Sequence, residues 1–165
     1  MIPIDFPELV NIVNKLDSAA IKLLVLVGPP ASGKTRLIMK LASSFGSPVI
    51  NVGKDVSQQL LAMTVRQRKL KAEEVIGNLL RGTDDHIVCL DDTELLFDPA
   101  LSLNPLGLLR NLSRNRLVIA TWSGMLEDTS LVYAYRDHPE YFEQTVHGFP
   151  IVSVSDEKLH LFLAP

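Results

Sequence analysis

The stretch Gly28-Pro29-Pro30-Ala31-Ser32-Gly33-Lys34-Thr35 decides the fold, because it reads G-x-x-x-x-G-K-T, the Walker A or P-loop pattern. Residues 23–27 before it are a continuous apolar run, typical of a strand buried on both faces of a parallel sheet. Residues 34–45 after it repeat apolar side chains at helical spacing. This order of strand, glycine loop and helix predicts a phosphate-binding loop rather than an ordinary Gly/Pro turn.

The residue types in this loop match the chemistry of a nucleotide phosphate site. Glycines 28 and 33 allow backbone conformations and close approaches that a Cβ would prevent. The backbone N–H groups then converge on phosphate oxygens at a helix N-terminus. Lys34 is expected to reach the β- and γ-phosphates, and the Thr35 hydroxyl to ligate Mg²⁺. The predicted ligands are ATP and Mg²⁺, and the predicted nucleotide-binding residues are Gly28, Pro29, Pro30, Ala31, Ser32, Gly33, Lys34, Thr35 and Arg36.

Length and composition predict one soluble α/β domain spanning residues 1–165. The chain is 47% hydrophobic, which is enough for a real core, and its formal net charge is −3. This balance argues against binding nucleic acid or an anionic membrane over the whole surface. A local basic stretch at residues 66–71 is either a solvated helix face or a patch for nucleic acid or a partner, so direct nucleic-acid binding stays open.

The sequence also predicts a cytoplasmic location. The one cysteine, Cys89, lies in an apolar run, reads as a small core residue and fits a reducing cytosol. The first residues lack the basic and apolar segments of a signal peptide, and no apolar run approaches the length of a membrane span.

The periodicity of apolar residues and the positions of Gly, Pro and capping residues predict alternating helices and strands along the chain. The expected helices are residues 7–18, 34–45, 55–64, 66–81 and 105–111. The expected strands are residues 22–27, 49–52, 86–91, 117–120 and 151–154, with weaker strand signals at 131–135 and 159–163. Residues 123–148 are otherwise hard to interpret.

Asp91 is the candidate Walker B carboxylate. Four apolar residues precede it, so it stands at the end of a buried strand, where ligands of open α/β sheets bind. We therefore expect Asp91 to hold the hydrated Mg²⁺ beside Thr35. The alternative is an ordinary aspartate at the start of a turn.

Two further acids follow the Walker B position. Asp92 is adjacent to Asp91, and Glu94 lies two residues further on; either carboxylate could polarise the attacking water. We expect Asp92 to be the base because of its place at the strand end, although aspartate is a shorter arm than glutamate. Both acids could instead be surface residues of a turn.

Thr121 and Arg114 complete the candidate catalytic set. Thr121 ends the fourth predicted strand, where a polar group would face the γ-phosphate as a sensor or water orienter. Arg114 or Arg116, just before that strand, could supply positive charge to the transition state, most naturally in a neighbouring subunit. A solvated loop arginine is the alternative.

The order of these elements resembles the additional-strand division of P-loop ATPases, which includes the AAA+ and STAND families. The resemblance implies a three-layer αβα sandwich with a mostly parallel five-stranded sheet. It also implies that the 117–120 strand lies between the P-loop strand and the Walker B strand. The roughly ten residues after the fifth strand are too few for the helical lid of AAA+ proteins, so we expect no lid and no second sensor arginine.

A more specific combination of motifs resembles the BrxF family, the small P-loop proteins of type 3 BREX (bacteriophage exclusion) systems. The matching segments are Leu26-Val27-Gly28-Pro29-Pro30, Ile50-Asn51-Val52, Ser57-Gln58-Gln59-Leu60-Leu61, Asp91-Asp92-Thr93-Glu94-Leu95-Leu96-Phe97-Asp98-Pro99, Leu112-Ser113-Arg114-Asn115-Arg116 and His138-Pro139-Glu140-Tyr141. The resemblance implies a bacterial cytosolic protein acting beside a DNA methyltransferase and other defence components. Asp92 departs from the asparagine expected in that family, which favours Glu94 as the base.

Three functions remain open from the sequence. The first is an ATPase subunit of a phage-defence complex, slow in isolation and completed by partners or by a homo-oligomer. The second is a small-molecule or nucleotide kinase, although residues 123–148 carry only Arg136 where such kinases have an arginine-bearing lid. The third is a nucleotide switch that binds ATP without turning it over.

Overall fold

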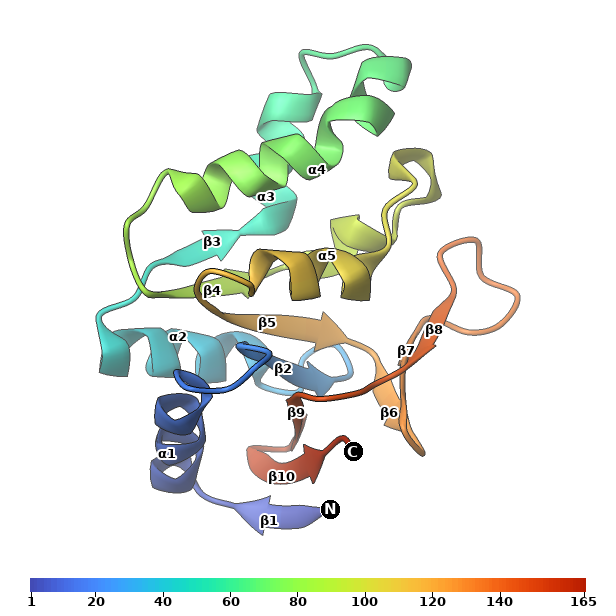
Figure 1. Cartoon of the computed structure of the whole chain (residues 1–165). Helices are drawn as coiled ribbons and strands as arrows, with labels where there is room; N and C mark the ends of the chain where they lie inside the picture. Colours follow the sequence, from blue (N-terminus) through green and yellow to red (C-terminus); the bar gives the residue numbers. More distant parts are fainter.

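A seven-stranded sheet forms the centre of the computed structural model, which describes residues 1–165 (Figure 1). The strand order is β1-β10-β9-β2-β5-β4-β3. The strands are β1 Ile2–Ile4, β2 Leu23–Gly28, β3 Val49–Asn51, β4 Ile87–Asp91, β5 Leu117–Ser123, β9 Pro150–Ser155 and β10 Lys158–Leu163. β9, β2, β5, β4 and β3 are mutually parallel. On the β9 side of the sheet, β10 pairs antiparallel with β9, and β1 pairs antiparallel with β10.

The predicted number of five strands is therefore wrong for the whole sheet and right for its parallel part. The expected insertion is confirmed: β5 lies between the strand before the glycine loop, β2, and the strand ending in Asp91, β4. The weak strand signal at 159–163 is β10. The three-residue strand β1 was not predicted, because a segment of that length with a central proline carries no periodic signal.

Helices cover both faces of the sheet, giving the expected three layers (Figure 1). The helices are α1 Phe6–Leu16, α2 Lys34–Phe45, α3 Val52–Leu60, α4 Val65–Arg81 and α5 Pro105–Leu112, and two short 3₁₀ turns, η1 Thr93–Phe97 and η2 Pro99–Leu101, follow β4. Alternate residues of β2 face opposite sides. Leu24 and Leu26 pack with α1 and α2, whereas Leu23, Val25 and Val27 pack with α3, α4 and α5. No helix combines the length and the apolar composition needed to cross a membrane.

Side-chain caps set several helix boundaries. The Asn51 side chain accepts from the Lys54 backbone N–H at 2.9 Å, so α3 begins at Val52, a residue that the sequence assigned to the preceding strand. The α4 helix begins with a capping box in which Thr64 and Gln67 bond each other's backbone N–H groups. The Asn51 cap therefore places the start of α3 directly at the carboxyl end of β3. Asn51 pairs with Asp91 of the neighbouring strand β4, so the start of α3 lies beside Asp91.

A second sheet of three antiparallel strands occupies the segment that was hard to interpret. Its strands are β6 Met125–Glu127, β7 Ser130–Tyr133 and β8 Phe142–Thr145. The Trp122 indole N–H donates to the Val132 carbonyl at 3.1 Å, and Phe97 stacks on Tyr133 with ring centroids 3.7 Å apart. These aromatic contacts fix the small sheet to the end of β5 and to η1.

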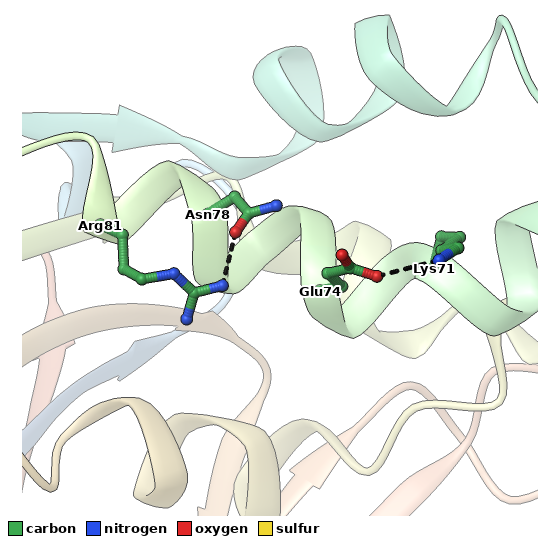
Figure 2. Close-up of polar contacts among 4 residues, drawn as sticks. All are labelled: Lys71, Glu74, Asn78 and Arg81. Carbon is green, nitrogen blue, oxygen red and sulfur yellow. Dashed lines mark hydrogen bonds and ion pairs between the residues drawn. The ribbon is translucent and has the colours of Figure 1, made fainter.

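In the basic stretch of α4, Arg66, Lys69 and Lys71 are exposed, as on a solvated helix face, whereas Arg68 is half-buried. Lys71 pairs with Glu74 at 3.2 Å, and the Arg81 guanidinium donates to Asn78 one turn away (Figure 2). Arg68 Nε instead donates to the carbonyls of Leu60 and Met63 and closes the α3–α4 turn. These local pairs stabilise the helix by a few tenths of a kcal/mol each.

Candidate functional site

Most of the predicted site residues line one cleft at the carboxyl ends of β2, β4 and β5, whereas Gly28, Pro29, Thr121 and Arg114 do not line it. The cleft has a volume of about 750 Å³, and only one of its 14 lining residues is hydrophobic. Its lining residues are Pro30, Ala31, Ser32, Gly33, Lys34, Thr35, Arg36, Asn51, Asp91, Asp92, Glu94, Ser123, Asp156 and Glu157. We call it the loop cleft. Its position agrees with the general rule that ligands of open α/β sheets bind outside the carboxyl ends of the strands.

The glycine loop turns sharply before α2. Ala31 and Gly33 both have left-handed backbone angles, with φ of 63° and 100°, and the Ser32 N–H bonds to the Pro29 carbonyl at 3.2 Å. Gly33 is the N-cap of α2 and supplies no side chain to cap it. The first N–H groups of α2 are therefore free to donate hydrogen bonds to an anion in the loop cleft.

Lys34 is held inside the loop. Its residue is only 6% exposed, and its Nζ donates to the Pro29 carbonyl at 2.7 Å and approaches Ser32 Oγ at 3.4 Å. Burial lowers the pKa of Lys34, while the negative charges of Glu94 and Asp91 act in the opposite direction. A buried ammonium with one carbonyl and one hydroxyl as partners is well placed to accept a more strongly charged ligand.

Asp91 and Thr121 meet across neighbouring strands. Thr121 Oγ1 donates to Asp91 Oδ1 at 3.0 Å, and Thr93 Oγ1 donates to the Thr121 carbonyl at 2.5 Å. Thr121 thus orients the Asp91 carboxylate. Asp91 and the Thr35 hydroxyl line the same cleft and are oxygen donors of the kind that Mg²⁺ takes together with waters and phosphate oxygens. The residues present therefore fit the predicted ion.

Glu94 and Asp92 form an unequal pair. Ser123 Oγ donates to Glu94 Oε1, and Glu94 Oε2 is buried with no hydrogen-bond partner. Burial raises the pKa of Glu94, but hydrogen bonds from Asp92 and Ser123 and the Lys34 charge outweigh it, so the net shift is downward. The hydrogen bond to Glu94, with burial, raises the pKa of Asp92 to about 6. The pKa of Glu94 therefore lies below that of Asp92.

The Asp92 side chain packs against the start of α3. Asp92 has a left-handed backbone, with φ of 52° and ψ of 59°, and its carbonyl accepts the Gly53 N–H at 3.0 Å. A Cβ on Gly53 would lie 2.4 Å from Asp92 Oδ2. Gly53 therefore lets the Asp92 carboxyl lie directly on the first turn of α3.

The raised pKa of Asp92 predicts a pH-dependent gain from Asp92→Asn. Between the unfolded value near 3.8 and the folded value of about 6, the native protein binds more protons than the unfolded chain, so ionising Asp92 destabilises the fold progressively. Asp92→Asn removes this penalty. Because Asp92 is partly exposed and screened, we expect a gain of about 1 kcal/mol or less above pH 6 that vanishes near pH 4. Thermal unfolding across this range measures it, and a gain that is larger at pH 4 would contradict the assignment.

Arg114 is not brought to this cleft. It is exposed just before β5 begins, at the opposite end of that strand from Thr121. Arg116 is used structurally, since its guanidinium donates to the carbonyls of Leu80 and Thr83 at 2.8 and 3.1 Å. Neither arginine reaches the loop cleft of its own chain.

Four residues that line the loop cleft were not predicted from the sequence. Ser123 and Asn51 come from strand ends, and Asp156 and Glu157 form the two-residue turn between β9 and β10. A signal existed for Asn51, an N-cap residue type directly after a strand. The others reach the cleft only through strand pairing, which a single sequence does not state.

Comparison with known proteins leaves the family of this chain unassigned. No family model matches it, and no curated protein matches it in sequence. Twenty solved chains match, among them one described as "Structure of C. elegans PCH-2". That match has 19% identity and a TM-score of 0.40, and it covers 70% of this chain and 35% of the other. The chain thus spans about a third of that structure's length.

Proposed function

We propose that this chain binds Mg·ATP in the loop cleft and hydrolyses it slowly, as the ATPase subunit of a bacterial phage-defence complex. The observation that carries the ATPase proposal is the convergence of the glycine loop, Lys34, Asp91 and Glu94 on one cleft. The assignment to a BREX-type complex in the bacterial cytoplasm rests on the sequence resemblance alone.

Each residue has a defined role in this proposal. Lys34 exchanges its contact with the Pro29 carbonyl for the β- and γ-phosphates, and the N–H groups at the start of α2 hold the phosphate chain. Asp91, oriented by Thr121, holds Mg²⁺ together with Thr35. The ion supplies positive charge against the phosphate oxygens.

Glu94 is the better candidate for the base, rather than Asp92. Ser123 orients one oxygen of the Glu94 carboxylate, which lines the cleft and has a lowered pKa, so an ionised Glu94 would be available to accept a hydrogen bond from a water there. Asp92 also lines the cleft, but its carboxyl lies against the first turn of α3 at Gly53.

We expect Glu94→Gln to slow ATP turnover by about 100-fold while leaving ATP affinity unchanged, because a base acts in the transition state. Glu73→Gln, an exposed change on α4, is the matched control. Single-turnover hydrolysis and equilibrium binding are the measurements. A fully active Glu94→Gln variant together with an inactive Asp92→Asn variant would assign the base to Asp92 instead.

The charges of the cleft support slow turnover by the isolated chain. Five carboxylates line it, from Asp91, Asp92, Glu94, Asp156 and Glu157, against the two cations of Lys34 and Arg36. Arg36 is itself paired with Glu157 at 2.9 Å. A phosphoryl transition state needs added positive charge, and an arginine supplied by a neighbour is worth several orders of magnitude in P-loop GTPases.

We therefore expect turnover per chain to rise with protein concentration or on adding the natural partner. Arg114→Ala should reduce that rise without weakening ATP binding, and Arg110→Ala in the same neighbourhood is the control. Steady-state ATPase activity over a dilution series, with molecular size measured in parallel, tests this. Fast turnover by a monomer would contradict it. A pull-down from the native cell with and without ATP tests the defence complex separately.

The same excess of carboxylates supports a second candidate, a nucleotide switch that binds ATP and does not turn it over. In that case the Glu94→Gln and wild-type proteins would bind ATP equally, and neither would release phosphate at any concentration or with any partner.

A further inference from the structure

β8 forms an open border of the small sheet, with β7 as its one strand partner. The Val146 N–H donates to the Thr129 carbonyl at 2.8 Å, and bonded and non-bonded pairs alternate along an antiparallel ladder. In this register the backbone groups of Glu143 and Thr145 point away from β7. Both residues are exposed, and no turn or loop hydrogen bond uses their backbone groups. They are therefore available to a further strand.

The sequence of β8 does not protect this border. Exposed strands are usually protected from pairing by proline, by lysine or by a bulge. β8 reads Phe-Glu-Gln-Thr, and its register with β7 is continuous from Phe142 to Thr145. An extended chain can therefore lie against β8 without meeting a steric or electrostatic block on the strand itself, apart from the single carboxylate of Glu143.

Two hollows lie between β8 and α5. The first has a volume of about 220 Å³ and is lined by Phe142 and Tyr141 on the β8 side and by Phe97, Leu103 and Pro105 on the α5 side. We call it the aromatic hollow. The Phe142 ring packs with Phe97, their centroids 5.9 Å apart, so this wall is fixed to the core of the protein.

The second hollow has a volume of about 450 Å³ and is positively charged. Gln144 of β8 lines it together with Gly107, Arg110 and Arg114, and none of its eight lining residues is acidic. The ion pairs of the structure involve neither arginine. We call it the arginine hollow. Two guanidinium groups without an anionic partner in one hollow match a carboxylate, which arginine binds through paired hydrogen bonds.

The two hollows lie in one line, which we call the strand–helix groove. Phe142 and Gln144 are two residues apart on a strand, or about 6.6–6.8 Å. Pro105 and Arg110 are five residues apart on a helix, or about 7.5 Å. Residues i and i+2 of an extended segment have this same separation. On a segment paired with β8, the residues opposite Phe142 and Gln144 project to the same face as these two, where the hollows lie.

We propose that the strand–helix groove binds an extended segment of a partner protein, which adds to β8 as an antiparallel strand. The segment carries an acidic residue at Arg110 and Arg114 and, two positions later, a large apolar residue in the aromatic hollow. Backbone hydrogen bonds give affinity in this mode of recognition, and hollows for alternate side chains give specificity. The proposal involves no nucleotide and is independent of the proposed ATPase activity.

Charge and strand direction fix the order of the two residues. Asp98 and Glu140 line the aromatic hollow and disfavour an acid there, so the acid belongs at the arginines. β8 runs from the aromatic hollow toward the arginine hollow, and antiparallel pairing is the more stable kind. An antiparallel segment therefore reads acid-x-apolar from its N-terminus.

The side-chain test measures binding of a fluorescein-labelled peptide with Glu-Thr-Leu between Gly-Ser spacers to the full chain without nucleotide. Fluorescence anisotropy is the readout. We expect affinity to fall about tenfold when the peptide glutamate is replaced by glutamine, or when the order is reversed to Leu-Thr-Glu. Equal affinity for the glutamine peptide or for the reversed peptide overturns the proposal.

Arg110→Ala tests the arginine hollow directly. It should lower the affinity for the glutamate peptide about tenfold and leave the affinity for the glutamine peptide unchanged. Arg66→Ala, an exposed change on α4, is the control. An equal loss for both peptides overturns the carboxylate contact. Because the ATP dilution series contains no such segment, Arg110→Ala still isolates the effect of Arg114 there.

The backbone test compares Thr145→Pro with Thr145→Ala. Both lose the hydroxyl contact with Ser130 at 3.3 Å, but only proline removes the N–H that points away from β7. Proline is tolerated on an edge strand when its nitrogen faces outward. We expect Thr145→Pro to lose peptide binding while Thr145→Ala keeps it, with thermal unfolding as the check on folding. Equal binding by the two variants overturns strand addition.

Amide hydrogen exchange on the wild type gives a readout that needs no variant. Bound peptide should slow exchange of the Glu143 and Thr145 amides at least about tenfold, because both then donate to the added strand. Unchanged exchange at these two amides, or no peptide binding up to about 1 mM, overturns the proposal. A dimer of the protein alone that the peptide dissociates would identify a second copy as the occupant and overturn the assignment to a partner protein.

Discussion

Lys34→Ala is expected to lower the affinity for Mg·ATP by about 100-fold while the protein stays folded. Lys34 is 6% exposed and lies in the proposed phosphate site, where a charge-assisted hydrogen bond would contribute roughly 1.5–3 kcal/mol. Its present hydrogen-bond partners are the Pro29 carbonyl and Ser32 Oγ, both in the loop, so removing the ammonium breaks no hydrogen bond outside the loop.

Calorimetric titration and a thermal unfolding curve, run on the same preparation, measure both parts of this expectation. Lys15→Ala, at the exposed end of α1, controls for the loss of one positive charge. A folded Lys34→Ala protein with wild-type ATP affinity would refute the assignment of the glycine loop as a phosphate site.

Gly28→Ala is expected to destabilise the fold by about 1–3 kcal/mol and to weaken ATP binding together with it. A Cβ at this position would lie 2.5 Å from both the Val154 carbonyl oxygen and Ser32 Oγ. The carbonyl belongs to the backbone of β9 and cannot rotate away. Relief therefore requires β2 and β9 to separate or the loop to move, and either shift displaces the N–H groups that receive the ligand.

Gly77→Ala is the matched comparison. The nearest atoms to its added Cβ are 3.5 Å away, at the flexible end of the Arg81 side chain, and the residue lies inside α4. Alanine is favoured over glycine in a helix interior by about 0.5–1 kcal/mol, so this variant should gain stability and bind ATP normally. Chemical denaturation of both variants measures the contrast, and equal stabilities would contradict the steric argument.

The sequence predicted the glycine loop, the strand that ends in Asp91 and the insertion of β5 between them. The glycine loop follows from a fixed spacing of residues, and the strand from a buried apolar run. The insertion of β5 followed from the resemblance to additional-strand P-loop ATPases. Sequence analysis did not pair Glu94 with Ser123, because that contact depends on β4 and β5 being neighbours and on η1 turning back toward β5. The preference for Asp92 as base came from adjacency along the chain, whereas its left-handed backbone turns it toward Gly53.

The edges of the structure were predicted least well. β1 and two strands of the small sheet are three or four residues long, too short for a periodic pattern to stand out. They are strands because a partner lies beside them: Ile4 pairs with Leu159, and Met125 with Val132. Such pairing is tertiary and overrides weak local preference.

Pro3, in the middle of β1, limits how copies of this protein can associate. β1 is the outermost strand on one side of the large sheet, and a proline there offers no N–H to a further strand. On the other side, β3 is three residues long and passes directly into α3. Neither border of the sheet offers a continuous ladder to a second chain. An assembly that delivers an arginine to a neighbour's nucleotide must therefore be built through surfaces other than the two borders of the large sheet.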